Sequence, residues 1–545
     1  MRERSEFISW VQDILSDGEA FRDFLVESLT ELCAIDSTPE PDVNKLAMRE
    51  RQAFEAIRAI ASRDWPEAVW QYRPIDFERM RGEDSYTPPY YTDSTAPYAQ
   101  RSNLVMTLPG TGAAPDAGTA RVAVNAHIDT VPPHIAPNVH DGRVFARGAC
   151  DDKGNIVVML GALHLLQQIK KQFGVAVCRD VTCMFVIDEE SGGNGSLALA
   201  LDRDLKQHYD ELAVLECCDN VVYCANRGAV WFRIELPATL TDEPLKLTSE
   251  LVLALEAAGR KIREESDHPL FLARPIQTCH GIWGPWGEHP SRVCGYVEFT
   301  VRSALGQDAL QTAIKDGVSH YITLYGDKTQ VTRDGKPVVP WHVRLEQQQD
   351  GILLQVMGST GHMAAVAEND GALTKAACII DALKRADPSC HIELGGHEAG
   401  TTLVLEGGQS FIPTHPLPVV KERIWAAAGA VLARYGVSDA DVRRLVTMNK
   451  LHNSAFCSDP ESPLFLNARD FADSVGLPQN ATPQGWGASC DARLFAEQYP
   501  QLPIITMGAG DLNNAHSDTE SIGIEDVARN SALLALLLLQ RSGAV

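Results

Sequence analysis

Four short apolar runs in this chain each lead into residues that can bind a metal ion. They are rich in β-branched residues and do not alternate with polar ones, a pattern typical of strands buried on both faces. The runs are RVAVNA (121–126), VTCMFVI (181–187), ELAVL (211–215) and LPIITMG (502–508). Helical stretches such as 154–171 lie between them. Strands that alternate with helices predict an α/β fold, with a mainly parallel central sheet flanked by crossover helices.

The carboxyl ends of these predicted strands carry the polar residues. His127 and Asp129 follow the first run, Glu189 and Glu190 follow the second, and Glu216 follows the third. Ligands of open parallel sheets collect beyond the carboxyl ends of the strands. We therefore expect these side chains to meet at one rim of the sheet.

His127 and Asp129 are two positions apart, so in an extended segment their side chains point the same way. His127 suits a metal ligand, and Asp129 can accept the other imidazole N–H and fix the tautomer. Taken alone, a His-x-Asp pattern is more often structural. The pattern supports a metal site only if the other candidate ligands lie beside it.

Asp151 lies in ARGACDDKG (146–154), in a turn just before a predicted helix. A carboxylate has two oxygens and can bridge two cations, so Asp151 is a candidate bridging ligand. The alternative is that Asp151 or Asp152 caps the helix that begins near Lys153.

Glu189 and Glu190 are adjacent carboxylates at a strand end, which is costly unless a positive group lies between them. Both cannot point at one metal from an extended backbone. We assign Glu190 as a ligand and Glu189 as the general base on a metal-bound water. The alternative is a solvated acidic turn, against which stands the apolar strand immediately upstream.

Two further ligands come from later in the chain. Glu216 is preferred over its competitor Asp219, and His516 lies in the loop after the last strand, where a lone His is more often a surface residue. If Asp151 bridges, each of two metals receives one His, one terminal carboxylate and the shared Asp, with room for a water. This mixture of nitrogen and oxygen suits Zn²⁺, with Co²⁺ or Mn²⁺ possible.

The order of these motifs resembles the acetylornithine deacetylase/succinyl-diaminopimelate desuccinylase/carboxypeptidase family of dinuclear zinc metallohydrolases. The matching motifs are HIDTVP (127–132), RGACDDKG (147–154), EESGGNGS (189–196), GASCDAR (487–493) and AHSDTE (515–520). The match spans residues 120–228 and 453–545.

The resemblance implies a role for each site residue. His127, Asp151 and Glu216 would hold one zinc, and Asp151, Glu190 and His516 the other. Asp129 would orient His127, and Glu189 would be the base. One departure is ECCD (216–219), where many members have Glu-Pro-Thr.

Many members are shorter, so the resemblance also implies an inserted lid. We expect a catalytic domain made of 1–228 and 453–545, interrupted by an α+β lid at 229–452. Three predicted strand–helix units suggest that the lid is duplicated. They are the strand 231–236 with the helix 247–262, the strand 294–304 with the helix 308–322, and the segment 352–383.

Four more residues are candidates for contact with the substrate. By the resemblance, His362 in GSTGHMAAV (358–366) stabilises the tetrahedral oxyanion, and Arg302 occupies a position that can clamp a substrate carboxylate. Arg302 is equally compatible with an exposed strand end. Ser489 and Arg493 are substrate-binding candidates, although Arg493 with Asp491 can instead shape the loop around Ser489.

The charge and the cysteines limit the other classes of function. Lys and Arg total 48 against 72 Asp and Glu, a net charge of −24, which argues against binding to nucleic acid or an anionic membrane. No apolar run reaches about 18 residues, and the N-terminus resembles an amphipathic helix rather than a secretory signal. The 13 cysteines lack a zinc-type spacing. We interpret them as reduced thiols of a cytoplasmic protein.

The predicted function is zinc-dependent hydrolysis of an amide bond in an N-acyl amino acid or a small peptide, as in deacetylases, desuccinylases and peptidases. The metal-bridging water is activated by Glu189. An exopeptidase or dipeptidase is the alternative. A non-catalytic metal-binding protein is disfavoured, because Glu189 would be dispensable for metal binding alone. A doubled lid would supply His362 from the same chain, which favours a monomer over a homodimer.

Overall fold

The computed structural model describes residues 4–112, 118–271, 278–289, 292–333, 335–362, 369–448 and 452–543. The chain forms two compact units. The first combines Met1–Asn226 with Phe456–Val545, and the second is Arg227–Ala455. The first unit is therefore built from both ends of the chain, and the second is inserted into it.

A six-stranded sheet forms the centre of the first unit, in the order β1-β2-β6-β3-β7-β23. The last four strands of this order are parallel to one another, and β2 is antiparallel to both β1 and β6. The predicted α/β fold with a mainly parallel sheet is thus confirmed. The strands are β1 (Val69–Pro74), β2 (Ser102–Leu108), β3 (Val122–His127), β6 (Val181–Val186), β7 (Glu211–Leu215) and β23 (Ile504–Met507).

Burial explains why the central strands have no alternating pattern. Every residue of β3, β6, β7 and β23 is buried, so both faces of each strand need apolar side chains. All four apolar runs of the sequence correspond to these strands. The antiparallel edge formed by β1 and β2 was not predicted.

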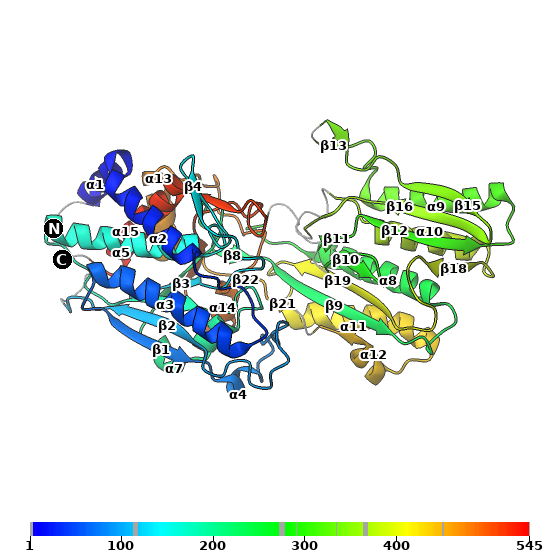
Figure 1. Ribbon diagram of the computed structural model, residues 1–545, viewed down its shortest axis with the longest axis horizontal. Coiled ribbons are helices and arrows are strands. Elements are labelled where there is room, and N and C mark those ends of the chain that lie inside the picture. Colours follow the sequence, from blue (N-terminus) through cyan, green and yellow to red (C-terminus); the bar gives the residue numbers. More distant parts are fainter. Residues whose placement is uncertain are drawn as a thin grey trace. The chain divides into compact units, whose positions relative to one another are not determined.

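Helices cover both faces of this sheet. Ala123 and Met184 pack with Leu199 of α6 and Phe495 of α14 on one face. Successive strand residues point to opposite faces, and α5 contacts β3. Helices α2, α5 and α15 pack against one another (Figure 1). Gly161 permits this approach, since a Cβ there would lie 2.4 Å from Ser531 Oγ. The helices are α1 (Arg4–Asp17), α2 (Glu19–Cys33), α3 (Val43–Asp64), α4 (Phe77–Met80), α5 (Lys153–Phe173), α6 (Asn194–Leu201), α7 (Arg203–Lys206), α13 (Pro463–Ser474), α14 (Ala492–Gln498) and α15 (Ile524–Arg541).

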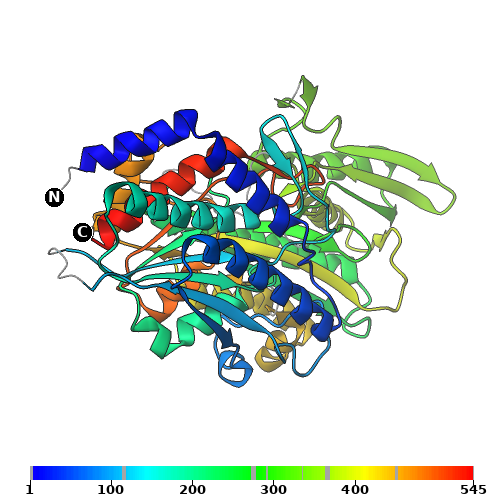
Figure 2. The same cartoon turned by 60° about the vertical axis from the view of Figure 1, so that its left-hand side comes forward.

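The two ends of the chain meet in the first unit. The first helix, α1, and the last, α15, lie side by side (Figure 2). Arg541 at the end of α15 donates to both carboxylate oxygens of Glu211 at the start of β7, at 2.9 and 2.6 Å, and both residues are buried. Short strands complete the unit: β4 (Asn138–His140), β5 (Arg143–Phe145), β8 (Ala225–Asn226), β22 (Phe456–Cys457) and β24 (Ser521–Gly523).

The second unit contains two larger antiparallel sheets. One has the order β10-β19-β9-β20, with β21 also paired to β9, and the other has the order β15-β16-β12-β18. Their strands are β9 (Gly228–Leu236), β10 (Thr278–Trp283), β19 (Leu403–Phe411), β20 (Val446–Thr447) and β21 (His452–Asn453), and β12 (Tyr296–Arg302), β15 (Val343–Gln348), β16 (Gly351–Met357) and β18 (His391–Leu394). Smaller pairs are β11 (Arg292–Val293) with β17 (Gly361–His362), and β13 (Thr332–Arg333) with β14 (Lys336–Pro337).

The helices of the second unit include those predicted from the sequence. The predicted helices 247–262 and 308–322 are confirmed. The first extends three residues further at each end, and the second starts one residue earlier and ends three residues later. The helices are α8 (Pro244–Glu265), α9 (Gln307–Tyr325), α10 (Ala372–Ala386), α11 (Leu417–Leu432) and α12 (Asp439–Leu445). Across the part of the chain that the structure describes, no helix combines the length and the apolar character needed to cross a membrane.

Candidate metal centre and active site

His127 is the last residue of β3 and begins the cluster. Its imidazole is buried, with Nε2 3.0 Å from Asp151 Oδ1 and 3.8 Å from Glu216 Oε1. Glu216 follows β7, the neighbour of β3 in the sheet, and Asp151 lies in the turn before α5. Asp219, the competitor of Glu216, instead accepts the backbone N–H of Leu512 at 3.3 Å.

Asp151 is shared with a second group. Its Oδ2 lies 3.2 Å from His516 Nε2, and the same nitrogen lies 2.9 Å from Glu190 Oε1. Two sets of side chains therefore have ligand atoms within 4.8 Å of one another: His127, Asp151, Asp152 and Glu216, and Asp151, Glu190 and His516. The structure thus brings together all five residues predicted as ligands. The His516 side chain remains 48% exposed, so the cluster reaches the surface of the first unit.

The cluster packs several buried carboxylates beside two imidazoles, a combination typical of cation sites. Burial raises the pKa of Glu216 well above its usual value, and the nearby Asp151 and Asp152 raise it further. Burial also raises the pKa of Glu190. Glu190 and Asp151 raise the pKa of His516 to about 12. Crowding of carboxylates is costly unless positive charge lies among them, and nitrogen and oxygen donors of this kind fit two divalent cations.

Asp152 was considered in the sequence only as a helix cap, and the structure shows a different role. It lies at the N-cap position of α5 but makes no capping bond to the helix backbone. Its Oδ2 accepts the backbone N–H of His127 at 3.2 Å, and its Oδ1 accepts Asn155 Nδ2–H at 2.7 Å. Asp152 therefore fixes the end of β3. The only sequence signal for this role was a second acidic residue beside Asp151.

Asp129 contacts both halves of the cluster. Its Oδ1 and Oδ2 accept the backbone N–H groups of Glu189 and Glu190, each at 3.1 Å. His127 Nδ1 lies 3.0 Å from the Asp129 carbonyl oxygen and 3.4 Å from Oδ1. Asp129 thus holds the turn with the two glutamates as well as the histidine, a contact that sequence reasoning missed.

Glu189 lies beside the metal-ligand groups but belongs to neither of them. Burial raises its pKa well above the usual value, and the negative charges of Asp491 and Glu216 add to this effect. A raised pKa makes the carboxylate a stronger proton acceptor, which is what a general base requires.

Of the candidate residues Arg493 and Ser489, Arg493 contacts the turn that follows Glu190. Arg493 is buried, and its Nη2 donates to the carbonyl oxygen of Gly192 at 3.0 Å. A Cβ on Gly193, whose φ is +80°, would lie 2.5 Å from Asp491 Oδ1, so glycine is needed there. Ser489 Oγ accepts a hydrogen bond from Asn226 at 3.1 Å.

The remaining two candidates belong to the second unit. Arg302 ends β12 and is exposed, with its guanidinium donating to both oxygens of Glu393 at 2.8 and 3.0 Å and to the Asp350 carbonyl at 2.8 Å. His362 ends β17, and its side chain lies outside the described part of the chain.

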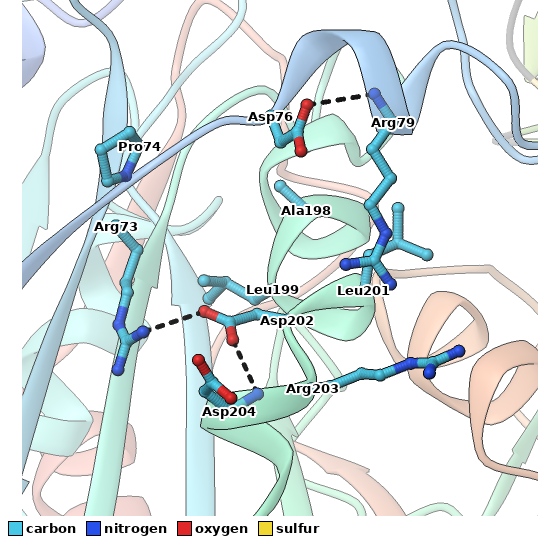
Figure 3. A pocket seen from close by; sticks show the side chains of 10 residues that line it. All are labelled: Arg73, Pro74, Asp76, Arg79, Ala198, Leu199, Leu201, Asp202, Arg203 and Asp204. Atoms are coloured by element: carbon cyan, nitrogen blue, oxygen red, sulfur yellow. Dashed lines mark hydrogen bonds and ion pairs between the residues drawn. The ribbon is translucent and has the colours of Figure 1, made fainter.

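A separate pocket of about 280 Å³ lies between β1, α4, α6 and α7 (Figure 3). None of the predicted site residues lines it. In its wall, Arg73 Nη1 lies 3.1 Å from Asp202 Oδ2, and Asp202 also caps α7. This pocket is therefore distinct from the metal-ligand cluster.

Glu520 supports the turn that carries Asp151. Its Oε1 accepts the backbone N–H groups of Cys150 and Asp151 at 3.0 and 3.1 Å, and its Oε2 accepts from Arg147. Glu520 and Arg147 are fully buried. The sequence did not point to this residue, which is 369 positions from Asp151.

Glu520→Ala is expected to destabilise the protein by about 3–5 kcal/mol, because it leaves the buried Arg147 charge without its partner. Urea unfolding measures the change. Asp518→Ala is the matched control, since Asp518 is an exposed acid of the same loop, and its effect should stay within about 0.5 kcal/mol. Equal stabilities of the two variants would contradict the prediction.

Comparisons with known proteins agree with this geometry. The sequence profile of Peptidase family M20/M25/M40 matches residues 123–540. A curated relative, the [LysW]-lysine/[LysW]-ornithine hydrolase of Saccharolobus islandicus (strain Y.N.15.51 / Yellowstone #2), is 27% identical over 217 residues, which are 39% of this chain and 58% of that protein. The chain thus spans little more than half the length of such relatives.

Two solved structures share the fold over nearly the whole chain. The dipeptidase Dug1p from Saccharomyces cerevisiae has a TM-score of 0.55 and 12% identity, covering 98% of this chain and 98% of that one. Human carnosine dipeptidase 1 has a TM-score of 0.54 and 12% identity, covering 99% and 100%. The metallohydrolase family predicted from the ordered motifs is confirmed, and the chain belongs to peptidase family M20/M25/M40.

Proposed function

We propose that this chain is a metal-dependent hydrolase that cleaves an amide bond in an N-acyl amino acid or a short peptide. The observation that carries the proposal is the position of Asp151, whose two oxygens face two different histidines, each with its own glutamate. Family membership supports the same class of reaction.

His127, Asp151 and Glu216 would hold one cation, and Asp151, Glu190 and His516 the other. Asp152 is assigned a supporting role, because both of its oxygens already accept N–H groups. The donor set suits Zn²⁺, with Co²⁺ or Mn²⁺ as alternatives. When bound, the cations would polarise the scissile carbonyl and acidify the attacking water.

Glu189 is assigned as the general base. It takes a proton from the attacking water and passes it to the leaving amine. Asp129 supports this role because it holds the backbone of Glu189. His362 is assigned to the oxyanion, a contact worth about 2.7–4 kcal/mol per donor.

Substrate contacts are assigned to Ser489, Arg493 and Arg302. Arg493 is positioned under the turn that carries Glu189, through its bond to Gly192. Arg302 would have to exchange Glu393 for a substrate carboxylate, which its planar fork can bind in the same way.

The experiment compares two substrate classes. The purified chain, loaded with Zn²⁺, Co²⁺ or Mn²⁺, is incubated with acetylated and succinylated amino acids and with dipeptides, and the free amine is measured. We expect amine release that requires metal and is absent from Glu189→Gln. Preferential cleavage of dipeptides would select the dipeptidase alternative. A chain that binds two metals but cleaves neither class would overturn the proposal.

We also propose that the chain works as a cytoplasmic monomer. All 13 cysteines are free, and only Cys457 is exposed, which suits a compartment that keeps thiols reduced. The two larger sheets of the inserted unit support the idea of a doubled lid that supplies His362 from the same chain. An obligate dimer in light scattering would contradict the monomer.

A further inference from the structure

The turn that carries Glu189 and Glu190 starts with a residue in an uncommon conformation. Asp188 follows β6, is buried, and has a φ of +60°. The left-handed region is rare for residues other than glycine, although aspartate tolerates it better than most. Such a conformation persists where the surroundings fix it. The contacts of Asp188 show what fixes it here.

Arg101 binds the Asp188 carboxylate with two nitrogens. Nη2 lies 2.6 Å from Oδ1, and Nη1 lies 3.2 Å from Oδ2. The hydroxyl of Tyr91 donates to the same Oδ2 at 2.8 Å and accepts from Arg101 Nη1 at 2.6 Å. The Arg101 side chain is completely buried. A fork of this kind sets both the position and the plane of the carboxylate.

Glu50 of α3 anchors the other side of Arg101. Arg101 Nε lies 3.1 and 3.0 Å from the two oxygens of Glu50. Burial raises the pKa of Glu50 to about 7; the nearby Asp188 carboxylate adds to this rise, and the Arg101 guanidinium opposes it. None of Glu50, Tyr91, Arg101 and Asp188 belongs to the metal-ligand groups. The network therefore connects α3, the segment before β2 and the turn after β6.

We propose that Arg101, with Tyr91 and Glu50, is a positioning network that orients Glu189. Asp129 holds the backbone of Glu189 and Glu190 from one side, and Arg101 holds the preceding Asp188 from the other. Glu190 has a further contact through His516, whereas Glu189 depends on the turn itself. Loss of the fork should therefore disturb the base more than the cation sites. The inference rests on the proposed role of Glu189.

Two variants test the network. Arg101→Lys keeps the charge but cannot bridge two carboxylates with a planar fork. We expect kcat to fall about 100-fold, the scale of a misplacement of about 1 Å. Tyr91→Phe removes only the hydroxyl, and should lower kcat roughly tenfold. In both variants, KM and the number of bound metal ions per chain should remain those of the wild type.

A double-mutant cycle separates positioning from general stability. In a Glu189→Gln background, Arg101→Lys should lower the residual rate no further, because its target is already absent. A purely structural role would lower the rate in both backgrounds and would reduce the metal content. Arg73→Lys is the matched control, because Arg73 also pairs with an aspartate of this unit but lies in the separate pocket of Figure 3. Its kcat should be unchanged.

The outcomes distinguish this inference from the proposed function. If Glu189→Gln retains full activity, the assignment of Glu189 as the base is wrong, and the positioning inference fails with it. If Glu189→Gln is inactive while Arg101→Lys and Tyr91→Phe retain wild-type kcat, only the positioning network is wrong. Additive losses in the cycle would also overturn it.

Discussion

Replacing Glu189 by glutamine is expected to lower kcat by about 10²–10⁴-fold while both metal ions remain bound. The amide has almost the same shape as the carboxylate but cannot take the proton of the attacking water. Glu189 lies outside both metal-ligand groups, so metal content should not change. Steady-state kinetics and metal analysis of the same preparation measure the two effects.

The neighbouring residue provides the control for this prediction. Glu190 contacts His516 at 2.9 Å and belongs to the second group, so Glu190→Gln should lose metal from one site as well as activity. The two adjacent substitutions thus separate catalysis from binding. A fully active Glu189→Gln variant, or one that loses metal as Glu190→Gln does, would refute the assignment.

Replacing Asp151 by asparagine is expected to weaken both cation sites together, because its two oxygens face both histidines. A ligand present at 100 times its Kd stabilises a protein by about 2.7 kcal/mol. The wild-type Tm should therefore rise on addition of Zn²⁺, and that of Asp151→Asn should rise far less. Asp204→Asn, an exposed acid of the same unit, should behave as the wild type. Equal metal-induced shifts in all three proteins would show that Asp151 is no bridge.

The metal-free protein should also lose stability as the pH rises. The pKa values of Glu190, Glu216 and His516 are raised in the folded state, so the folded chain binds more protons than the unfolded chain. Stability then falls with pH above the ordinary glutamate pKa of about 4.5, and continues to fall above that of histidine. Bound cations replace these protons, so urea unfolding of the metal-loaded protein should show a weaker slope. The same slope with and without metal would contradict this.

The candidate ligands could be grouped from the sequence because they lie at strand ends or in the loops after them. His127 ends β3, and Glu190 and Glu216 follow β6 and β7. These three strands are neighbours in the sheet, so their carboxyl ends bring the residues together. His516 follows β23, the next strand along. In each case a local pattern, an apolar run followed by a polar residue, was enough to identify the candidate ligand.

The contacts that support the candidate site could not be predicted, because no local sequence pattern marks them. Glu520 reaches the turn of Asp151 from 369 positions away, and Arg101 reaches Asp188 across 87. These pairs depend on how loops pack on the finished sheet, and no periodicity marks them. A buried Arg–Asp contact has the same appearance in a sequence as two exposed charges. Candidate ligands can therefore be identified from the sequence, whereas the residues that position them become visible only in the structure.

The discontinuous first unit has a consequence for biosynthesis. Strand β23, His516 and helix α15 all follow the inserted unit in the chain, so they leave the ribosome after it. Until then, the exposed edge of β7 and the apolar surface of α5 lack their covering partners. The inserted unit can acquire its own sheets earlier, because its residues are contiguous. The nascent chain can therefore assemble the candidate metal-ligand cluster only after the inserted unit has been synthesised.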